Sequence, residues 1–287
     1  TGVGVCMPII MIVTAFAALV ASGSAPRASI AMGRGDRDTA EKLLGDSFSL
    51  QIAISLTLTA VLLLFGHEFL LAFGASENTI EYADNYLNIY AFGTLFVELT
   101  LGMNAFITAQ GFATTGMMTV LIGAVCNIVL DPIFIFGLNM GVRGAALATV
   151  ISQGVSCVWV VSFLMGKKTS LRLKAQNMRI DMKLLAPCIA LGLSAFIMQS
   201  TESLISIVMS SGLQRYGGDL YVGSMTIMQS VMQMLVMPIQ GITQGAQPIM
   251  SYNYGAKNYS RVRKTFSLLL KVMLLVTVSG FALAALL

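Results

Sequence analysis

Long uninterrupted runs of apolar residues dominate the chain, and polar residues gather in the short segments between them. As an α-helix, each run is long enough to cross a bilayer core of roughly 30 Å. The runs are too long and too uniformly apolar for membrane β-strands, which alternate in polarity over about ten residues. Eight spans are predicted, over residues 3–31, 48–74, 82–110, 116–137, 144–166, 184–213, 220–251 and 266–287.

The composition supports this interpretation. Of the 287 residues, 56% are hydrophobic and 10% are charged, whereas a soluble domain carries about 25% charged residues. Backbone groups in hydrocarbon must pair internally, and a helix pairs them within one segment. The predicted fold class is therefore all-α, a polytopic transmembrane helical bundle with the lipid bilayer as its surroundings.

Basic residues fix the expected orientation. All but two of the 17 Lys and Arg residues, Arg143 and Arg215, fall near the segments that follow the first, fifth and seventh spans. By the positive-inside rule these segments are cytoplasmic, which predicts a multi-pass protein of the bacterial cytoplasmic membrane. No aromatic residues interleave with the basic ones, so nucleic acid is not an expected partner.

Enzyme and metal chemistry find little support in the sequence. The four cysteines lie in apolar runs at unrelated spacings, and the one histidine, His67, has no partner ligands nearby in sequence. A zinc site needs several such ligands. The motifs of serine hydrolases and zinc proteases are absent from the sequence. We expect neither an enzyme nor a metal site.

Two stretches of the chain match each other at a shift of 222 residues. Each ends an apolar span with a proline, which bends a helix, and then a glycine, which ends one. Chance similarity of helix ends is the alternative. Because an even number of spans separates the copies, the match predicts a parallel repeat about an axis along the membrane normal. The paired residues are Gly23 with Gly245, Pro26 with Pro248, Ser29 with Ser251, and Gly33 with Gly255.

Three stretches resemble the MATE family of multidrug and toxic compound exporters, in particular its bacterial multidrug pump branch. The first runs from Asn127 through Asp131 and Pro132 to Thr149. The second runs from Gln244 through Pro248 to Gly255 and Ala256, and the third over residues 31–41. Pro26 is the first-copy counterpart of Pro248.

The resemblance implies two pseudo-symmetric six-helix lobes, of which the chain would hold helices two to nine of twelve and so be incomplete at both ends. The expected domains are a first lobe over residues 1–166, a cytoplasmic inter-lobe loop over 167–183 and part of a second lobe over 184–287. The implied function is export of amphipathic organic cations by alternating access, by a monomer, in exchange for Na⁺ or H⁺ and without another cofactor. Which ion and which compounds are involved is left open.

Acids in mid-span are the candidate site residues, because a carboxylate in the bilayer is costly and usually functional. Glu202 lies among hydroxyl residues that include Ser206, and oxygen is the ligand that hard cations prefer. Its place in the seventh helix matches that of a cation-binding acid in one MATE branch. We expect Glu202 and Ser206 to couple the ion, the alternative being a structural carboxyl.

Glu98 is the second mid-span acid and could meet cationic substrates, although a role in helix packing is an alternative. Asp131 precedes Pro132 near the outer end of its helix and could be either functional or a structural helix cap. Adaptable Met and amide side chains could line the substrate cavity as well, or they could fill the core or join helices. They are Gln199, Met228, Gln229 and Gln233.

Two rival functions fit the sequence less well than an exporter. A lipid-linked sugar flippase of the same superfamily would need basic residues inside the spans to neutralise pyrophosphate, and essentially none lies in mid-span. A channel would need a re-entrant filter loop or a ring of charges, and neither stands out.

Overall fold

The computed structural model describes residues 2–73, 75 and 79–286; for residues 2–3, 283–286 and part of 206–235 it describes the backbone alone. The regular structure in these ranges is helical, as predicted. Its elements are α1 (Gly2–Gly33), α2 (Arg37–Ala72), α3 (Ile80–Ala109), α4 (Ala113–Pro132) with the π-helical turn η1 (Ile133–Gly137), α5 (Gly141–Met165), the 3₁₀ turn η2 (Ala175–Asn177), α6 (Met182–Gly255) and α7 (Tyr259–Leu286).

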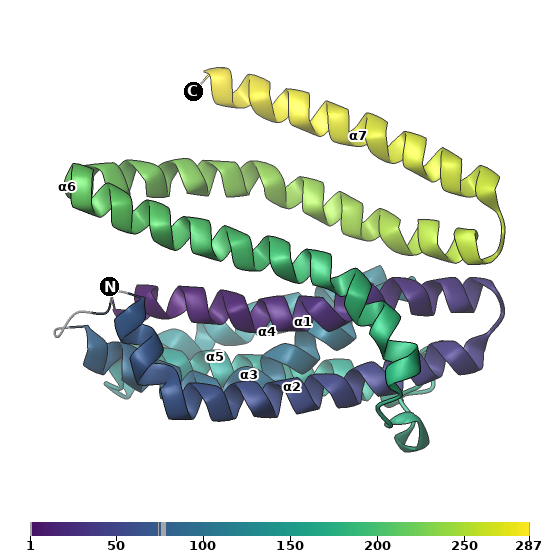
Figure 1. The fold of residues 1–287 in the computed structure, drawn as a ribbon, viewed down its shortest axis with the longest axis horizontal. Coiled ribbons are helices and arrows are strands. Elements are labelled where there is room, and N and C mark those ends of the chain that lie inside the picture. The colour runs from purple at the N-terminus through teal and green to yellow at the C-terminus, as the bar shows by residue number, and fades with distance from the viewer. Residues whose placement is uncertain (1, 74, 76–78, 287) are drawn as a thin grey trace.

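The element α6 is a helical hairpin rather than one rod. Its 74 residues would span about 110 Å if straight, but the ribbon turns back on itself at the left end of Figure 1. We call residues 182–205 its first arm and residues 224–255 its second arm. The two arms correspond to the predicted spans 184–213 and 220–251.

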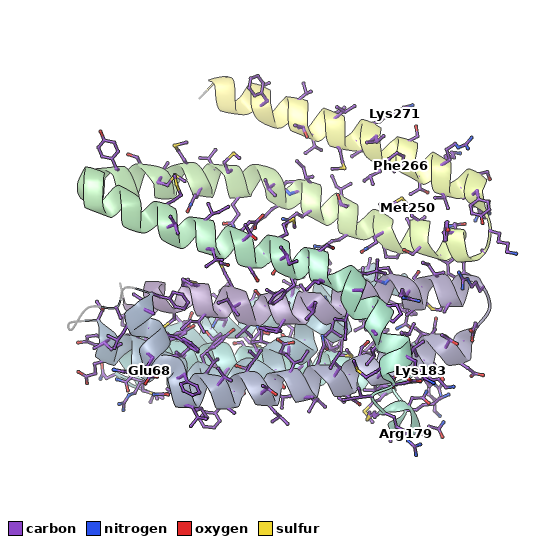
Figure 2. The ribbon with its side chains drawn as sticks, viewed as in Figure 1. Glu68, Arg179, Lys183, Met250, Phe266 and Lys271 are labelled. Carbon is purple, nitrogen blue, oxygen red and sulfur yellow. The ribbon has the colours of Figure 1, made fainter. Side chains whose placement is uncertain are left out.

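Seven segments of the described chain are long and apolar enough to cross a membrane. They correspond to the predicted spans except the one over 220–251, which forms the second arm and contains residues whose side chains are not described. Successive helices reverse direction, and Figure 2 places Arg179 and Lys183 at the opposite end from Glu68. The charge asymmetry of the sequence therefore follows the long axis of the molecule.

Helix α2 begins well before its predicted start at residue 48. Asp36 caps its N-terminus by accepting a hydrogen bond of 3.1 Å from the backbone N–H of Thr39. The first turns carry the polar residues Glu41 and Asp46, both 3% exposed. Because these residues point inward and find polar partners in the following loops, the helix continues where the apolar pattern ends.

Helices α1 to α5 pack into a bundle with α3 at its centre. In α3, 61% of the most apolar window is buried, more than in any other candidate span. One core cluster of the bundle includes Leu44 and Phe106, near the basic end, and another includes Val13 and Leu87, nearer the opposite end. The first arm of α6 packs along α1, as the contact between the rings of Phe16 and Phe196 shows.

Candidate functional site

Small residues allow α1 and the first arm of α6 to approach closely. A Cβ added to Gly23 would collide with the carbonyl oxygen of Cys188, and one added to Gly192 would collide with that of Leu19. Close backbone approach through small residues is typical of helix pairs in membranes. The contact fixes the first arm, and Glu202 with it, against the α1–α5 bundle.

The two copies of the sequence repeat meet at the basic end of the molecule. A Cβ on Gly33 would collide with the carbonyl oxygen of Tyr252, and a Cβ on Gly255 would collide with that of Ile30. The repeat shift of 222 residues relates Ile30 to Tyr252 and Gly33 to Gly255. Each copy therefore presents the same pair of positions to the other, as in an isologous two-fold contact.

A hydrogen bond supports the same contact. The Ser29 hydroxyl, which is fully buried, donates to the carbonyl oxygen of Pro248 at 3.3 Å. Away from this end the second arm of α6 diverges from α1 (Figure 1). The repeat copies are thus joined at their cytoplasmic ends, where both contain the proline that the sequence singled out.

The loop between Met165 and Met182 is anchored to the cytoplasmic ends of α2 and α3. The side-chain oxygen of Gln110 accepts hydrogen bonds from the Thr169 hydroxyl at 2.8 Å and from the Leu171 N–H at 2.7 Å. The carboxylate of Glu41 forms an ion pair with Lys174. These contacts tie the predicted inter-lobe segment to the α1–α5 bundle.

The predicted coupling acid lies on an uncovered face of the first arm. Glu202 is exposed, whereas its neighbour Ser203 is 4% exposed and its hydroxyl lies 3.6 Å from the sulfur of Met11. Gln199, one turn earlier, is half-buried. The side chain of Ser206 lies outside the described residues, so its place beside Glu202 stays a prediction.

The predicted Met and Gln residues of the second arm are exposed. Met228 lines a groove of about 510 Å³ between the second arm and α7, together with apolar residues such as Phe281. Gln229 and Gln233 are exposed but do not belong to that groove. The structure therefore separates Met228 from the two amides, which the sequence had placed in one cavity wall.

The other mid-span acid lies in the interior. Glu98 is fully buried on α3, and neither of its carboxylate oxygens makes a hydrogen bond to any residue that the structure describes. Gln51 and Thr94, which were not among the predicted site residues, are also fully buried, and their polar side-chain atoms have no hydrogen-bond partner in the described part of the chain. The sequence does contain a pattern that indicates a shared polar face. Thr94 lies four residues before Glu98 on α3, and Gln51 lies four residues before Ser55 on α2, so each pair lies on one side of its helix.

A cavity of about 310 Å³, which we call the polar-residue cavity because most of its lining residues carry hydroxyl or amide groups, lies between α3, α4 and α5. Asn127 on α4 lines it and also donates to Asp131 at 3.5 Å, one turn further along. Pro132 is the last residue of α4, and the π-helical turn η1 begins directly after it. Seven further lining residues carry hydroxyl or amide groups and were not among the predicted site residues: Thr100, Asn104, Thr119, Thr149, Ser152, Gln153 and Ser156.

Comparison with known proteins now decides the family. A family model described as MatE matches residues 1–133 and 194–287. The chain belongs to the MatE family. This confirms the resemblance to MATE transporters.

Two curated relatives are staphylococcal multidrug export proteins. The chain is 26% identical over 270 residues to the multidrug export protein MepA of Staphylococcus haemolyticus (strain JCSC1435), covering 94% of the chain and 59% of the relative. It is 28% identical over 224 residues to MepA of Staphylococcus aureus (strain NCTC 8325 / PS 47), covering 77% and 49%. The chain therefore spans about half to three-fifths of the length of these relatives.

Solved transporter structures share the fold. The MATE multidrug transporter DinF-BH, solved as a complex, matches with a TM-score of 0.91 and 36% identity, over 98% of this chain and 63% of that one. A MOP superfamily transporter from Pyrococcus furiosus, described as having a binding pocket of reverse polarity, matches with a TM-score of 0.87 and 24% identity, over 97% and 62%. This MATE chain is thus a multi-pass membrane protein, and its bacterial relatives agree with the predicted cytoplasmic membrane.

Proposed function

We propose that this MATE chain forms part of an exporter that exchanges Na⁺ or H⁺ for amphipathic organic cations by alternating access. One observation carries the proposal. The two repeat copies meet through equivalent positions at the cytoplasmic end, Gly33 against Tyr252 and Gly255 against Ile30. A contact between two similar halves can part without unfolding either half, as a rocking motion requires.

In the proposed cycle, the Gly33 and Gly255 contact closes the cytoplasmic side. Parting the contact would open a path from the cytoplasm between α1 and the second arm of α6. The arm that carries Glu202 is held to α1 at Gly23, so movement of α1 is transmitted to Glu202. We assign cation exchange to Glu202, which is exposed and therefore open to an ion.

The sign of the charges supports cationic substrates. Mid-span charge comes from the acids Glu98 and Glu202, while basic side chains such as Arg27 and Arg37 lie near the cytoplasmic ends of their helices. The P. furiosus protein of this fold, with its pocket of reverse polarity, illustrates that pocket charge can vary while the fold is kept. A lipid pyrophosphate would need basic groups in mid-span, whereas the exposed carboxylate of Glu202 can meet an organic cation. We further propose that the exporter acts as a monomer.

Whole-cell efflux of a fluorescent organic cation tests the function. Cells expressing the natural polypeptide are loaded with the dye and energised with and without a Na⁺ gradient, at two external pH values. We expect efflux that depends on one of the two gradients and is abolished by Glu202→Gln. Glu68→Gln, which changes an exposed acid at the outer end of α2, is the matched control. Efflux that depends on neither the Na⁺ gradient nor the pH gradient would overturn the proposal.

A further inference from the structure

The interior of the α1–α5 bundle contains a polar stripe on α3. Thr94, Glu98 and Gly102 are spaced by four residues and therefore lie on one face of the helix. All three are buried, and Thr94 and Glu98 are fully buried. A polar face inside an apolar bundle needs a physical reason.

This face is covered by α2. The hydroxyl of Thr59 on α2 donates to the carbonyl oxygen of Ala91, one position in the same stripe, at 2.9 Å. The side-chain amide of Gln51 lies against Gly102, where an added Cβ would collide with both the nitrogen and the oxygen of that amide. Glu98 lies between these two contacts and so faces α2.

The antiparallel register places a further oxygen at the level of Glu98. Ser55 lies midway between Gln51 and Thr59 on α2, and it is fully buried. Its hydroxyl donates to the carbonyl oxygen of Ile52 at 2.8 Å, which leaves the hydroxyl oxygen free to accept or to ligate. Ser55 therefore adds an oxygen ligand to this part of the interface.

Most of these polar atoms have no hydrogen-bond partner among the described side chains and backbone groups. Both carboxylate oxygens of Glu98, both amide atoms of Gln51 and the hydroxyl of Thr94 are buried without a hydrogen bond. Buried polar groups are nearly always paired, and a group of unpaired ones requires an explanation. Three such side chains from two helices, gathered on one interface, point to a ligand that the protein holds there.

The chemistry of the donors selects the ligand. Glu98 and Thr94 on α3 offer two carboxylate oxygens and a hydroxyl oxygen, and Gln51 and Ser55 on α2 add an amide oxygen and a second hydroxyl oxygen. This set of oxygens suits a hard cation. The basic residues of α2, Arg37 and Lys42, belong to its cytoplasmic end, and α3 contains none. On α3 the titratable residue nearest to Glu98 in sequence is Tyr90, about two helical turns earlier.

We propose that Glu98, with Gln51, Thr94 and Ser55, binds one monovalent cation, Na⁺ or H⁺, inside the α1–α5 bundle. A single carboxylate balances one positive charge, and the full burial of Glu98 excludes an organic cation, which is far larger. The site therefore replaces the expected role of Glu98 in a substrate cavity. It is distinct from Glu202, which lies exposed on α6.

The importance of this site for transport rests on the proposed exporter function. Binding of a cation at the site does not depend on that function. Cation binding can be measured on the purified natural polypeptide without any transport. A protein that binds the cation but exports nothing would refute the exporter and leave the site standing. A protein that exports the dye while Glu98 variants bind cations normally would refute the site alone.

The first arm of the experiment measures ²²Na⁺ binding at alkaline pH for wild type, Glu98→Gln and Glu81→Gln. Glu81 is an exposed acid in the first turn of the same helix and serves as the matched control. The second arm records the infrared C=O band of protonated carboxyl groups as pH is raised. For Na⁺ we expect Glu98→Gln to bind one ion fewer per molecule. For H⁺ we expect a titrating carboxyl band that Glu98→Gln lacks.

Gln51→Leu and Thr94→Val keep the carboxylate and test the neutral ligands. If the site holds Na⁺, each should weaken binding by about 10-fold or more, by analogy with the loss of supporting groups around metals. If it holds a proton, each should shift the pH at which the Glu98 band disappears. The proposal would be overturned if Glu98→Gln altered neither Na⁺ binding nor the carboxyl band. It would also be overturned if Gln51→Leu and Thr94→Val matched wild type in both measurements.

Discussion

Gly33 and Gly255 occupy equivalent positions in the two repeat copies, and each leaves room for the backbone of the other copy. The carbonyl oxygens that they meet, those of Tyr252 and Ile30, are also equivalent. A backbone carbonyl cannot move aside as a long side chain can. The two glycines therefore set how closely the cytoplasmic ends of α1 and α6 approach.

Substitution of either glycine should hold these ends apart. We expect Gly33→Val and Gly255→Val each to penalise the closed contact by about 1–3 kcal/mol, a typical cost of overpacking. Efflux should fall, and Ser29→Cys, buried in this contact, should react faster with a cytoplasmic thiol reagent. Gly245→Ala is the control, since an added Cβ there meets nothing within 4 Å. If Ser29→Cys were labelled at the same rate with and without the Gly33→Val or Gly255→Val change, the glycine contact would not close the cytoplasmic side.

The ion pair between Glu41 and Lys174 should respond unequally to loss of its two partners. The Glu41 side chain is 4% exposed and that of Lys174 is 42% exposed. Lys174→Met leaves a buried carboxylate without its main partner, whereas Glu41→Gln leaves an ammonium group that can turn to water. We expect Lys174→Met to destabilise the protein by about 1–3 kcal/mol more than Glu41→Gln, as measured by thermal unfolding. Equal losses would mean that burial of Glu41 is unimportant.

Gln110 should control the order of the loop after α5. Its oxygen accepts two hydrogen bonds, from Thr169 and Leu171, so Gln110→Leu should expose the loop to protease. Gln110→Glu keeps both acceptor positions and should cleave as slowly as wild type. Limited proteolysis from the cytoplasmic side of inverted vesicles measures the difference. Rapid cleavage of both variants would show that the amide nitrogen, not the oxygen, matters.

Gly102 should influence the cation site without belonging to it. Because an added Cβ would occupy the place of the Gln51 amide, Gly102→Ala should displace that side chain from Glu98. We expect weaker binding of the cation with little loss of ordinary packing, since the moving atoms are the end of a flexible side chain. Gly123→Ala, which meets the Ser156 hydroxyl in the polar-residue cavity instead, is the comparison.

The cap of α2 should depend on pH. The hydrogen bond from Thr39 holds the pKa of Asp36 below its ordinary value. Since the folded-state pKa is depressed, the contribution to stability is present above the ordinary value of about 3.9 and is lost as pH falls through the lower value. Amide exchange in the first turn of α2 should therefore speed up in acid, relative to the intrinsic rate. Asp36→Ala should show fast exchange at every pH.

The sequence by itself determined the helices, their orientation and the repeat. Apolar length reveals a span because hydrocarbon forbids unpaired backbone, and basic segments mark the cytoplasmic side. The stretches around Pro26 and Pro248 already showed two similar helix ends. None of these conclusions requires knowing which residues touch, because each depends on the solvent or on a comparison of the chain with itself.

Only the tertiary structure decided which polar residues face one another. Glu98 and Glu202 look alike in sequence, as single acids in apolar spans, yet Glu98 is fully buried on α3 and Glu202 is exposed on α6. Whether an acid is enclosed depends on packing between helices that are distant in the chain. The start of α2 was missed for the same reason, since the partners of Glu41 and Asp46 lie more than a hundred residues away.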